Sequence, residues 1–163
     1  MRSILGWFGP VALAVMLCTT VAGADEQKVP LDKVPKVIMD SILGRFPGAQ
    51  VTSVEKEKEG AKILFDIELK HRGRKYEMDI EDNGTIMEIE KEIPLKDVPA
   101  AVLNAVKAKH PNAAVQEVME VNKVEGKKET PIHYEITIKE GDKKAQEVIV
   151  SLDGKSVKKE GEK

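Results

Sequence analysis

The chain contains the same unit twice, and this duplication constrains its fold more than any other feature. The segment 30–35 (PLDKVP) returns as residues 94–99 (PLKDVP), an offset of 64 (94 − 30). At that offset, residues 46–49 (FPGA) return as residues 110–113 (HPNA). Later segments match at offsets of 69 and 70, and the extra residues fall around 126–130 and before Glu147, where we expect loops. Two copies, over about residues 30–92 and 93–160, predict two similar structural units.

Each copy begins with a helical pattern. Val34, Ile38, Ile42 and Phe46 recur at helical spacing in the first copy, and a proline follows the pattern in both copies. We expect Asp32 and Asp97 to be the N-caps of these helices. Pro35 and Pro99 would then lie in the first turn, where a missing N–H costs little.

The rest of each copy alternates apolar and polar residues, which is typical of half-buried strands. Residues 63–69 and 76–80 alternate in the first copy, and residues 132–138 and 148–152 do so in the second. Predicted turns lie at Glu59-Gly60, Arg72-Gly73, Asn83-Gly84, Glu140-Gly141 and Asp153-Gly154.

These patterns predict an α+β fold in which each unit has one helix followed by about four antiparallel strands. The helices would cover one face of either a single eight-stranded sheet or two four-stranded sheets. The opposite face would be polar and densely charged. Its predicted residues are Glu68, Lys70, Lys75, Glu77, Asp79 and Glu81.

The N-terminus has the pattern of a secretory signal peptide. Arg2 precedes an apolar run over residues 4–18, and Ala22-Gly23-Ala24 supplies small residues for cleavage after Ala24. A lipid anchor on Cys18 is disfavoured because the large residue Leu17 precedes it. We therefore expect residues 1–24 to be a signal peptide, 25–92 the first repeat, and 93–163 the second repeat with a charged tail. The product would be exported to a periplasm or the exterior, with no membrane attachment after cleavage.

The composition of the mature chain excludes several classes of function. Removing 24 of the 163 residues leaves 139, without any cysteine, so a catalytic thiol and cysteine-ligated metals are excluded. With Arg2 gone, 25 basic residues face 28 acidic ones, a net charge of −3 without a bias toward nucleic acid. The histidines His71, His110 and His133 lack partners at the spacing of zinc ligands.

Residues 79–90 (DIEDNGTIMEIE) fit the template of a calcium-binding loop, with Asp79, Glu81, Asn83 and Glu90 as ligands. The flanking residues alternate as strands, however, whereas a calcium loop of this type joins two helices. The second copy keeps the turn, Asp153-Gly154, but not the ligands. We therefore interpret the segment as a hairpin, with calcium binding as the less favoured alternative.

A basic cluster at a predicted hairpin tip, His71, Arg72, Arg74 and Lys75, is a candidate surface for an acidic partner. We identify no catalytic residue and no cofactor-binding residue. The two Ser-x-x-Lys matches, at 53–56 and 156–159, fall in strands or the tail rather than at a helix start.

The chain resembles the PepSY-like, beta-lactamase-inhibitor-like family of exported bacterial proteins. The resemblance rests on residues 46–49 (FPGA), the strand 65–69 (FDIEL) and the hairpin 79–86 (DIEDNGTI), and it recurs weakly at 110–113 and Asp153-Gly154. It implies tandem helix-plus-sheet units outside the cytoplasm, proposed in that family to inhibit or restrain exported peptidases and other envelope enzymes. It supplies no catalytic residues.

The sequence thus predicts an exported, non-enzymatic binding or regulatory module without a cofactor. Its partner would be an unidentified protein of the cell envelope, recognised through the polar sheet face or the hairpin tips. The alternative is a calcium- or cation-responsive envelope protein that uses the 79–90 hairpin. A stand-alone hydrolase is the least favoured class, because no pair of nucleophile and base is evident. The oligomeric state is left open by the sequence.

Overall fold

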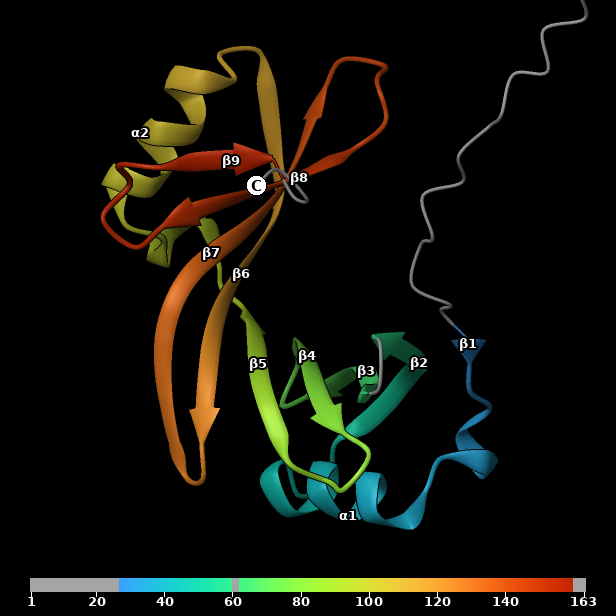
Figure 1. Cartoon of the computed structure of the whole chain (residues 1–163). Coiled ribbons are helices and arrows are strands. Elements are labelled where there is room, and N and C mark those ends of the chain that lie inside the picture. Colours follow the sequence, from blue (N-terminus) through green and yellow to red (C-terminus); the bar gives the residue numbers. More distant parts are fainter. Residues whose placement is uncertain (1–26, 60–61, 160–163) are drawn as a thin grey trace, which may run out of the picture.

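A computed structural model describes residues 27–59 and 62–159 of the chain (Figure 1). The elements of the first unit are β1 (Gln27–Lys28), the 3-10 helix η1 (Leu31–Lys33), α1 (Lys36–Arg45), β2 (Gln50–Glu59), β3 (Lys62–His71), β4 (Arg74–Glu81) and β5 (Ile86–Glu92). Those of the second unit are the 3-10 helix η2 (Leu95–Asp97), α2 (Ala100–Lys109), β6 (Ala113–Glu125), β7 (Lys128–Glu140), β8 (Gln146–Ser151) and β9 (Val157–Lys159). The predicted signal peptide lies outside the described residues, and so does Gly60 of the predicted turn at Glu59-Gly60.

All strands belong to one antiparallel sheet of nine strands, arranged in the order of the chain. The predicted α+β class is therefore confirmed, and the single sheet is the observed form of the two alternatives. The two units are joined through β5 and β6, which pair from Glu88↔Lys123 to Glu92↔Met119. β1 is a strand that the sequence patterns did not predict, and it pairs with β2 at Lys56 and Glu55. No described helix is long and apolar enough to cross a membrane.

Both helices cover the same face of the sheet, as the alternation predicted (Figure 1). Ile38 and Ile42 of α1 pack on the apolar face of β2–β5, and Val102 and Val106 of α2 pack on that of β6–β8. Their burial removes apolar surface from water, which is the main stabilising contribution to a fold without disulfides.

The predicted N-caps are wrong. Asp32 and Asp97 lie in the 3-10 helices η1 and η2, and the α-helices begin only after Pro35 and Pro99, which occupy the N-cap positions. Each 3-10 helix is followed by a residue in extended conformation, so a break separates the two short helical segments. A residue that precedes a proline is sterically disfavoured in helical geometry. The α-helices therefore cannot start at the aspartates, which lie before the residue that precedes each proline.

The turns at Asn83-Gly84 and Asp153-Gly154 close the β4–β5 and β8–β9 hairpins, and each presses against the helix of its own unit. A Cβ added to Gly84 would lie 2.8 Å from Cγ2 of Val37, and one added to Gly154 would lie 2.6 Å from the carbonyl oxygen of Ala101. Both glycines have positive φ, +88° and +69°. The turn that recurs in both copies therefore serves helix packing, which requires glycine at these positions.

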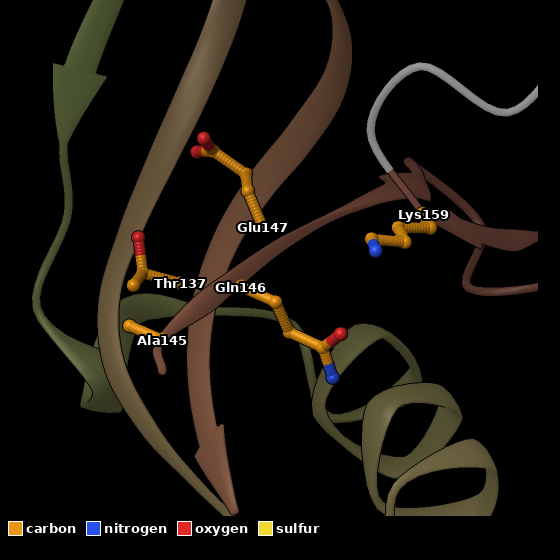
Figure 2. Close-up of a pocket in the computed structure, with 5 residues that line it drawn as sticks. All are labelled: Thr137, Ala145, Gln146, Glu147 and Lys159. Atoms are coloured by element: carbon orange, nitrogen blue, oxygen red, sulfur yellow. The ribbon is translucent and has the colours of Figure 1, made fainter. Parts of the chain in front are cut away.

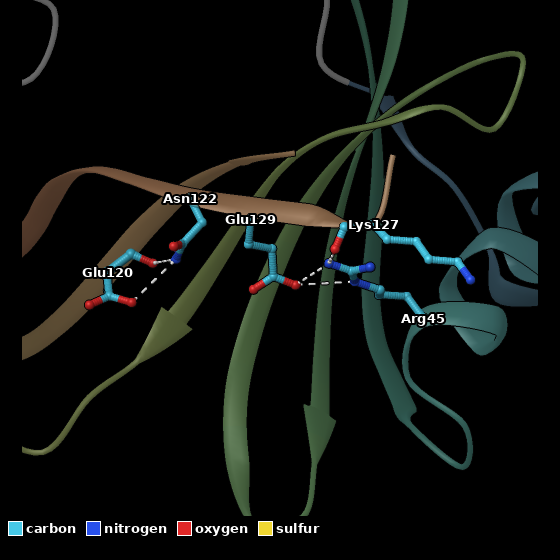
Figure 3. Close-up of polar contacts among 5 residues, drawn as sticks. All are labelled: Arg45, Glu120, Asn122, Lys127 and Glu129. Atoms are coloured by element: carbon cyan, nitrogen blue, oxygen red, sulfur yellow. Dashed lines mark hydrogen bonds and ion pairs between the residues drawn. The ribbon is translucent and has the colours of Figure 1, made fainter. Parts of the chain in front are cut away.

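The β6–β7 hairpin crosses from the second unit to the first. The sequence predicted that extra residues near 126–130 enlarge a loop, but they instead lengthen β6 and β7 to 13 residues each, against 10 each for β2 and β3. Val124 on the hairpin joins the apolar core of the first unit. The side chain of Arg45 on α1 pairs with Glu129, and its Nη2 also donates to the carbonyl oxygen of Lys127 (Figure 3).

Candidate functional site

The face of the sheet that carries no helix is the strongest candidate for a functional surface. Along β3, β4 and β5, the residues between the buried apolar positions are mainly acidic, and the strand register places them opposite one another. Asp66 lies across from Asp79, and Asp79 lies across from Glu88. Like charges at directly opposed positions of a sheet are destabilising, so this arrangement is not explained by stability.

A second row of carboxylates runs beside the first. Glu68 lies across from Glu77, and Glu77 lies across from Glu90. We call nine of the acidic residues on this side of the sheet the acidic face. The acidic face consists of Glu57 on β2, Asp66 and Glu68 on β3, Glu77 and Asp79 on β4, Glu88 and Glu90 on β5, Glu135 on β7 and Glu147 on β8.

Two buried apolar side chains lie on the side of the acidic face where the two units join. Met119 and Val121 of β6 point to this side, yet their exposed fractions are only 3% and 0%. Val121 lies between Glu90 on β5 and His133 on β7 in the strand register, and Met119 lies between Glu92 and Glu135. No described helix covers this side, so neighbouring side chains must bury the two residues. The two apolar side chains therefore lie beneath the surrounding side chains of this face.

This environment raises the pKa of three carboxyl groups of the acidic face. Burial, followed by repulsion from Glu135 and Glu77, raises the pKa of Glu90 to about 9. Burial and the charges of Asp79 and Glu77 raise the pKa of Asp66 to about 7. Burial and the charge of Glu88, with smaller contributions from other acids, raise the pKa of Asp79 to about 6. The acidic face therefore holds protons that isolated carboxyl groups would have lost at neutral pH.

Basic side chains contact carboxylates at the margin of the acidic face. Nζ of Lys75 lies 2.6 Å from Oε1 of Glu77 and 3.3 Å from Oε2 of Glu117. Burial lowers the pKa of Lys75, but the hydrogen bonds and charges of these two carboxylates outweigh it and raise the pKa overall. Nε2 of His133 lies 3.0 Å from Oε1 of Glu135. Among residues 27–59 and 62–159, no ion pair joins a cation to Asp66, Asp79 or Glu90.

A shallow hollow of about 400 Å³ lies at the β7–β8–β9 end of the sheet (Figure 2). Glu147 and Gln146 leave β8 in opposite directions in Figure 2, so the carboxylate points to the side of the acidic face and the amide to the other side. The remaining lining residues are Thr137, Ala145 and Lys159. Together these residues form no constellation of nucleophile and base, and we assign the hollow no chemistry.

The structure divides the residues of the sequence-predicted calcium loop between two strands and a turn. Asp79 and Glu90 point to the acidic face from β4 and β5, but Glu90 lies opposite Glu77 rather than Asp79. Oδ1 of Asn83 accepts a hydrogen bond from the N–H of Thr85 within the turn, and Nδ2 of Asn83 donates to Glu81. Within the described parts of the chain, no group of three or more His, Cys, Asp or Glu residues is arranged to hold a metal ion.

The basic cluster predicted at the β3–β4 turn does not form one patch. The ring of His71 lies 5.5 Å from that of Phe46, on the helix-covered side, whereas Lys75 points to the opposite side toward Glu77 and Glu117. Arg72 and Arg74 are exposed at the turn, and Arg72 adopts a φ of +51°. The tip of the β3–β4 hairpin therefore exposes only the two arginines of the predicted cluster.

The charged face was predictable from the sequence, but its central residues were not. Asp66, Glu88, Glu135 and Glu147 were not singled out, because their proximity depends on the register between strands. The alternation of acidic with apolar residues in β3, β4, β5, β7 and β8 was visible in the sequence and placed each acid on one side of its own strand. His133 lies within β7 beside Glu135.

Several solved structures share this fold. A putative periplasmic protein from Bacteroides eggerthii superposes with a TM-score of 0.55 at 17% identity, over 77% of this chain and 88% of that chain. A DUF2874 family protein from Bacteroides uniformis has a TM-score of 0.55 at 14% identity over the same shares. A BLIP-like protein from Bacteroides fragilis has a TM-score of 0.49 at 20% identity, over 79% and 88% of the two chains. The two proteins with a TM-score of 0.55 have low sequence identity, so their similarity shows the fold alone.

A comparison with curated protein sequences found no match. The family profile described as "Putative beta-lactamase-inhibitor-like, PepSY-like" matches residues 22–88 and again residues 65–157. The two matches span both copies of the duplicated unit and most of the chain, so the resemblance seen in the sequence is confirmed. This chain belongs to the PepSY-like family, and it carries two tandem copies of the family's unit.

Proposed function

We propose that this protein is an exported, non-enzymatic binding module that recognises a positively charged segment of an envelope protein through its acidic face. One observation carries the proposal: Asp66, Asp79 and Glu90 converge on one face of the sheet although their repulsion destabilises the fold. A surface that is unfavourable for folding and lies free of the helices is typical of a site kept for binding.

The charge of the acidic face supports the same function. Complementary charges favour association and select the partner. The carboxylates supply this charge, above the buried side chains of Met119 and Val121. A lysine- or arginine-rich segment of a peptidase or another envelope enzyme would neutralise these carboxylates, and its binding could restrain that enzyme.

The test is capture of partners from an envelope extract with three forms of the protein. The first is the natural protein, and the second is the triple variant Asp66→Asn, Asp79→Asn, Glu90→Gln, which keeps shape but removes charge. The third is the control Arg72→Gln, Arg74→Gln, which changes the β3–β4 tip. A partner that binds the first and third forms but not the second supports the acidic face. Binding that depends on the arginines would assign recognition to the hairpin tip instead.

A cation-responsive protein is the second candidate function. It is favoured by the observation that Asp79 and Glu90, from the sequence-predicted calcium set, both lie on the acidic face. Calcium would relieve the same repulsion that a basic segment relieves.

Calorimetric titration with calcium distinguishes the two candidates. Heat of binding together with a rise in melting temperature, both lost in the Asp79→Asn, Glu90→Gln variant, would support the cation-responsive function. Neither heat nor thermal shift at millimolar calcium would remove it and leave the protein-binding function.

A further inference from the structure

A basic hollow lies on the helix-covered side of the first unit, away from the acidic face. It has a volume of about 350 Å³, within the range of small-molecule sites, and lies where β1 and η1 meet β2 and β3. Phe65, only 4% exposed, is part of its wall. Lys28, Lys33 and Lys56 also line it, together with the rigid Pro30 and Pro35.

The lysines of this hollow are weakly compensated by acidic groups. Nζ of Lys33 lies 3.7 Å from Oδ2 of Asp32, and both side chains are largely exposed. No ion pair of Lys56 occurs among residues 27–59 and 62–159. Lys28 also lines the hollow, but it lies across from Glu55 in the β1–β2 ladder, on the opposite side of the sheet from Lys56. Lys56 is half-buried and lies directly across from Phe65 in the β2–β3 ladder. A cation held beside an apolar wall attracts an anion more strongly than a freely solvated lysine does.

The duplicated unit provides a comparison for this hollow. Lys56 pairs with Gln27 and Phe65 in the first unit, and Glu120 pairs with Lys91 and Tyr134 in the second. Lys56 and Glu120 therefore occupy equivalent positions.

The same register identifies the equivalents of the other lysines. Lys28 lies across from Glu55 and Glu92 lies across from Met119, so Lys28 corresponds to Glu92. Lys33 and Asp97 are the last residues of η1 and η2. Each lysine of the hollow thus has an acidic counterpart at the equivalent position of the second unit.

We propose that this hollow binds a small anionic ligand, with a carboxylate or phosphate group attached to an apolar body. The oxyanion would contact Lys33 and Lys56, and the apolar body would lie against Phe65 and the prolines. The reversed charges of the second unit confine this binding to the first unit. This site is independent of the acidic face, and its failure would leave the proposed function untouched.

Nuclear magnetic resonance titration of the purified exported protein tests the site. The probes are benzoate and phenyl phosphate, with benzyl alcohol as the neutral analogue and inorganic phosphate as the anion without an apolar body. We expect saturable shifts of the signals of Phe65, Val29 and Lys56 with both aromatic anions, and weaker effects with the other two. The relative response to benzoate and phenyl phosphate tells which oxyanion the site prefers.

Matched variants give the test its specificity. Lys56→Gln should weaken binding about tenfold, since a charge-assisted hydrogen bond is lost, and Lys56→Glu, which installs the residue of the second unit, should abolish it. Lys58→Gln is the control, because Lys58 lies two residues along the same strand but does not line the hollow. Melting curves confirm that each variant is folded.

Three outcomes would overturn the proposal. One is equal shifts with benzyl alcohol and benzoate, which would show an apolar contact alone. Another is equal weakening by Lys58→Gln and Lys56→Gln, which would show diffuse attraction to surface lysines. The third is the absence of shifts around Phe65 with any probe.

Discussion

Glu90 on β5 lies directly across from Val121 on β6, so a carboxyl group is held beside a fully buried apolar side chain. Glu77 faces the other side of Glu90 in the β4–β5 ladder, and burial with this repulsion raises the pKa of Glu90 to about 9. The sheet therefore holds a carboxyl group where its ionised form is disfavoured. This relationship makes the acidic face measurable through stability and proton binding as well as through a partner.

Glu90→Gln should stabilise the protein at neutral and alkaline pH. The amide keeps the shape of the protonated acid and removes the repulsion from Glu77 and Glu135. We expect the melting temperature at pH 8 to rise by a few degrees, equivalent to about 1 kcal/mol. The matched control is Glu125→Gln on the exposed β6–β7 tip, where a hydrogen bond from Lys123 holds the pKa of the acid low. A gain of stability in the control and not in Glu90→Gln would contradict the account.

The stability of the natural protein should fall as the pH rises. The pKa of Glu90 is raised from 4.5 to about 9, so between these values the folded protein binds more protons than the unfolded chain. Under this condition the free energy of unfolding decreases with pH. Stability from this group is greatest below pH 4.5 and is lost as the pH rises through about 9, and Asp66 adds to the decrease up to about pH 7. Melting curves across this range check the slope, which should be shallower in Glu90→Gln.

Gly154→Ala should be strongly destabilising, because its Cβ would lie 2.6 Å from the carbonyl oxygen of Ala101. Gly126→Ala is the control, since Gly126 also has a positive φ, +63°, but nothing within 4 Å of an added Cβ. The control should cost about 1 kcal/mol from backbone strain, and Gly154→Ala about 3 kcal/mol or more, measured by urea unfolding. Equal losses of stability in the two variants would show that the contact between the turn and the helix does not contribute to stability.

The fold could be predicted from the sequence because repetition and periodicity are local properties. The alternation of Phe65, Ile67 and Leu69 assigned a strand and its apolar side, and comparison of Asn83-Gly84 with Asp153-Gly154 identified a turn. That comparison favoured a hairpin over a calcium loop, and the structure shows the helix contact that requires the glycine.

The candidate site was less predictable, because it depends on distances across the sheet. The opposition of Asp66 and Asp79 is a matter of register, and the burial of Met119 and Val121 is a matter of sheet shape. Neither property can be predicted from a short stretch of sequence. The N-cap error at Asp32 had a local cause, because the 3-10 helix and the proline after it shift the start of α1.

The ion pair between Arg45 and Glu129 should couple the two units. Both side chains are partly exposed, so we expect a coupling energy of about 0.5–1 kcal/mol in a double-mutant cycle of Arg45→Gln and Glu129→Gln. High salt should reduce this coupling. Urea unfolding of the four proteins measures the value, and a coupling of zero at low salt would show that the contact does not join the units.

The most direct measurement of the central claim is the release of protons when a positively charged partner binds. At pH 7 the raised pKa values of Asp66 and Glu90 leave protons on the acidic face, and a cationic segment bound there would displace them. Calorimetric titration with the captured partner or an oligolysine peptide, in buffers of different ionisation enthalpy, measures this release. We predict proton release by the natural protein and little by the Asp66→Asn, Glu90→Gln variant. Binding without proton release, or the same release by the variant, would contradict recognition through the acidic face.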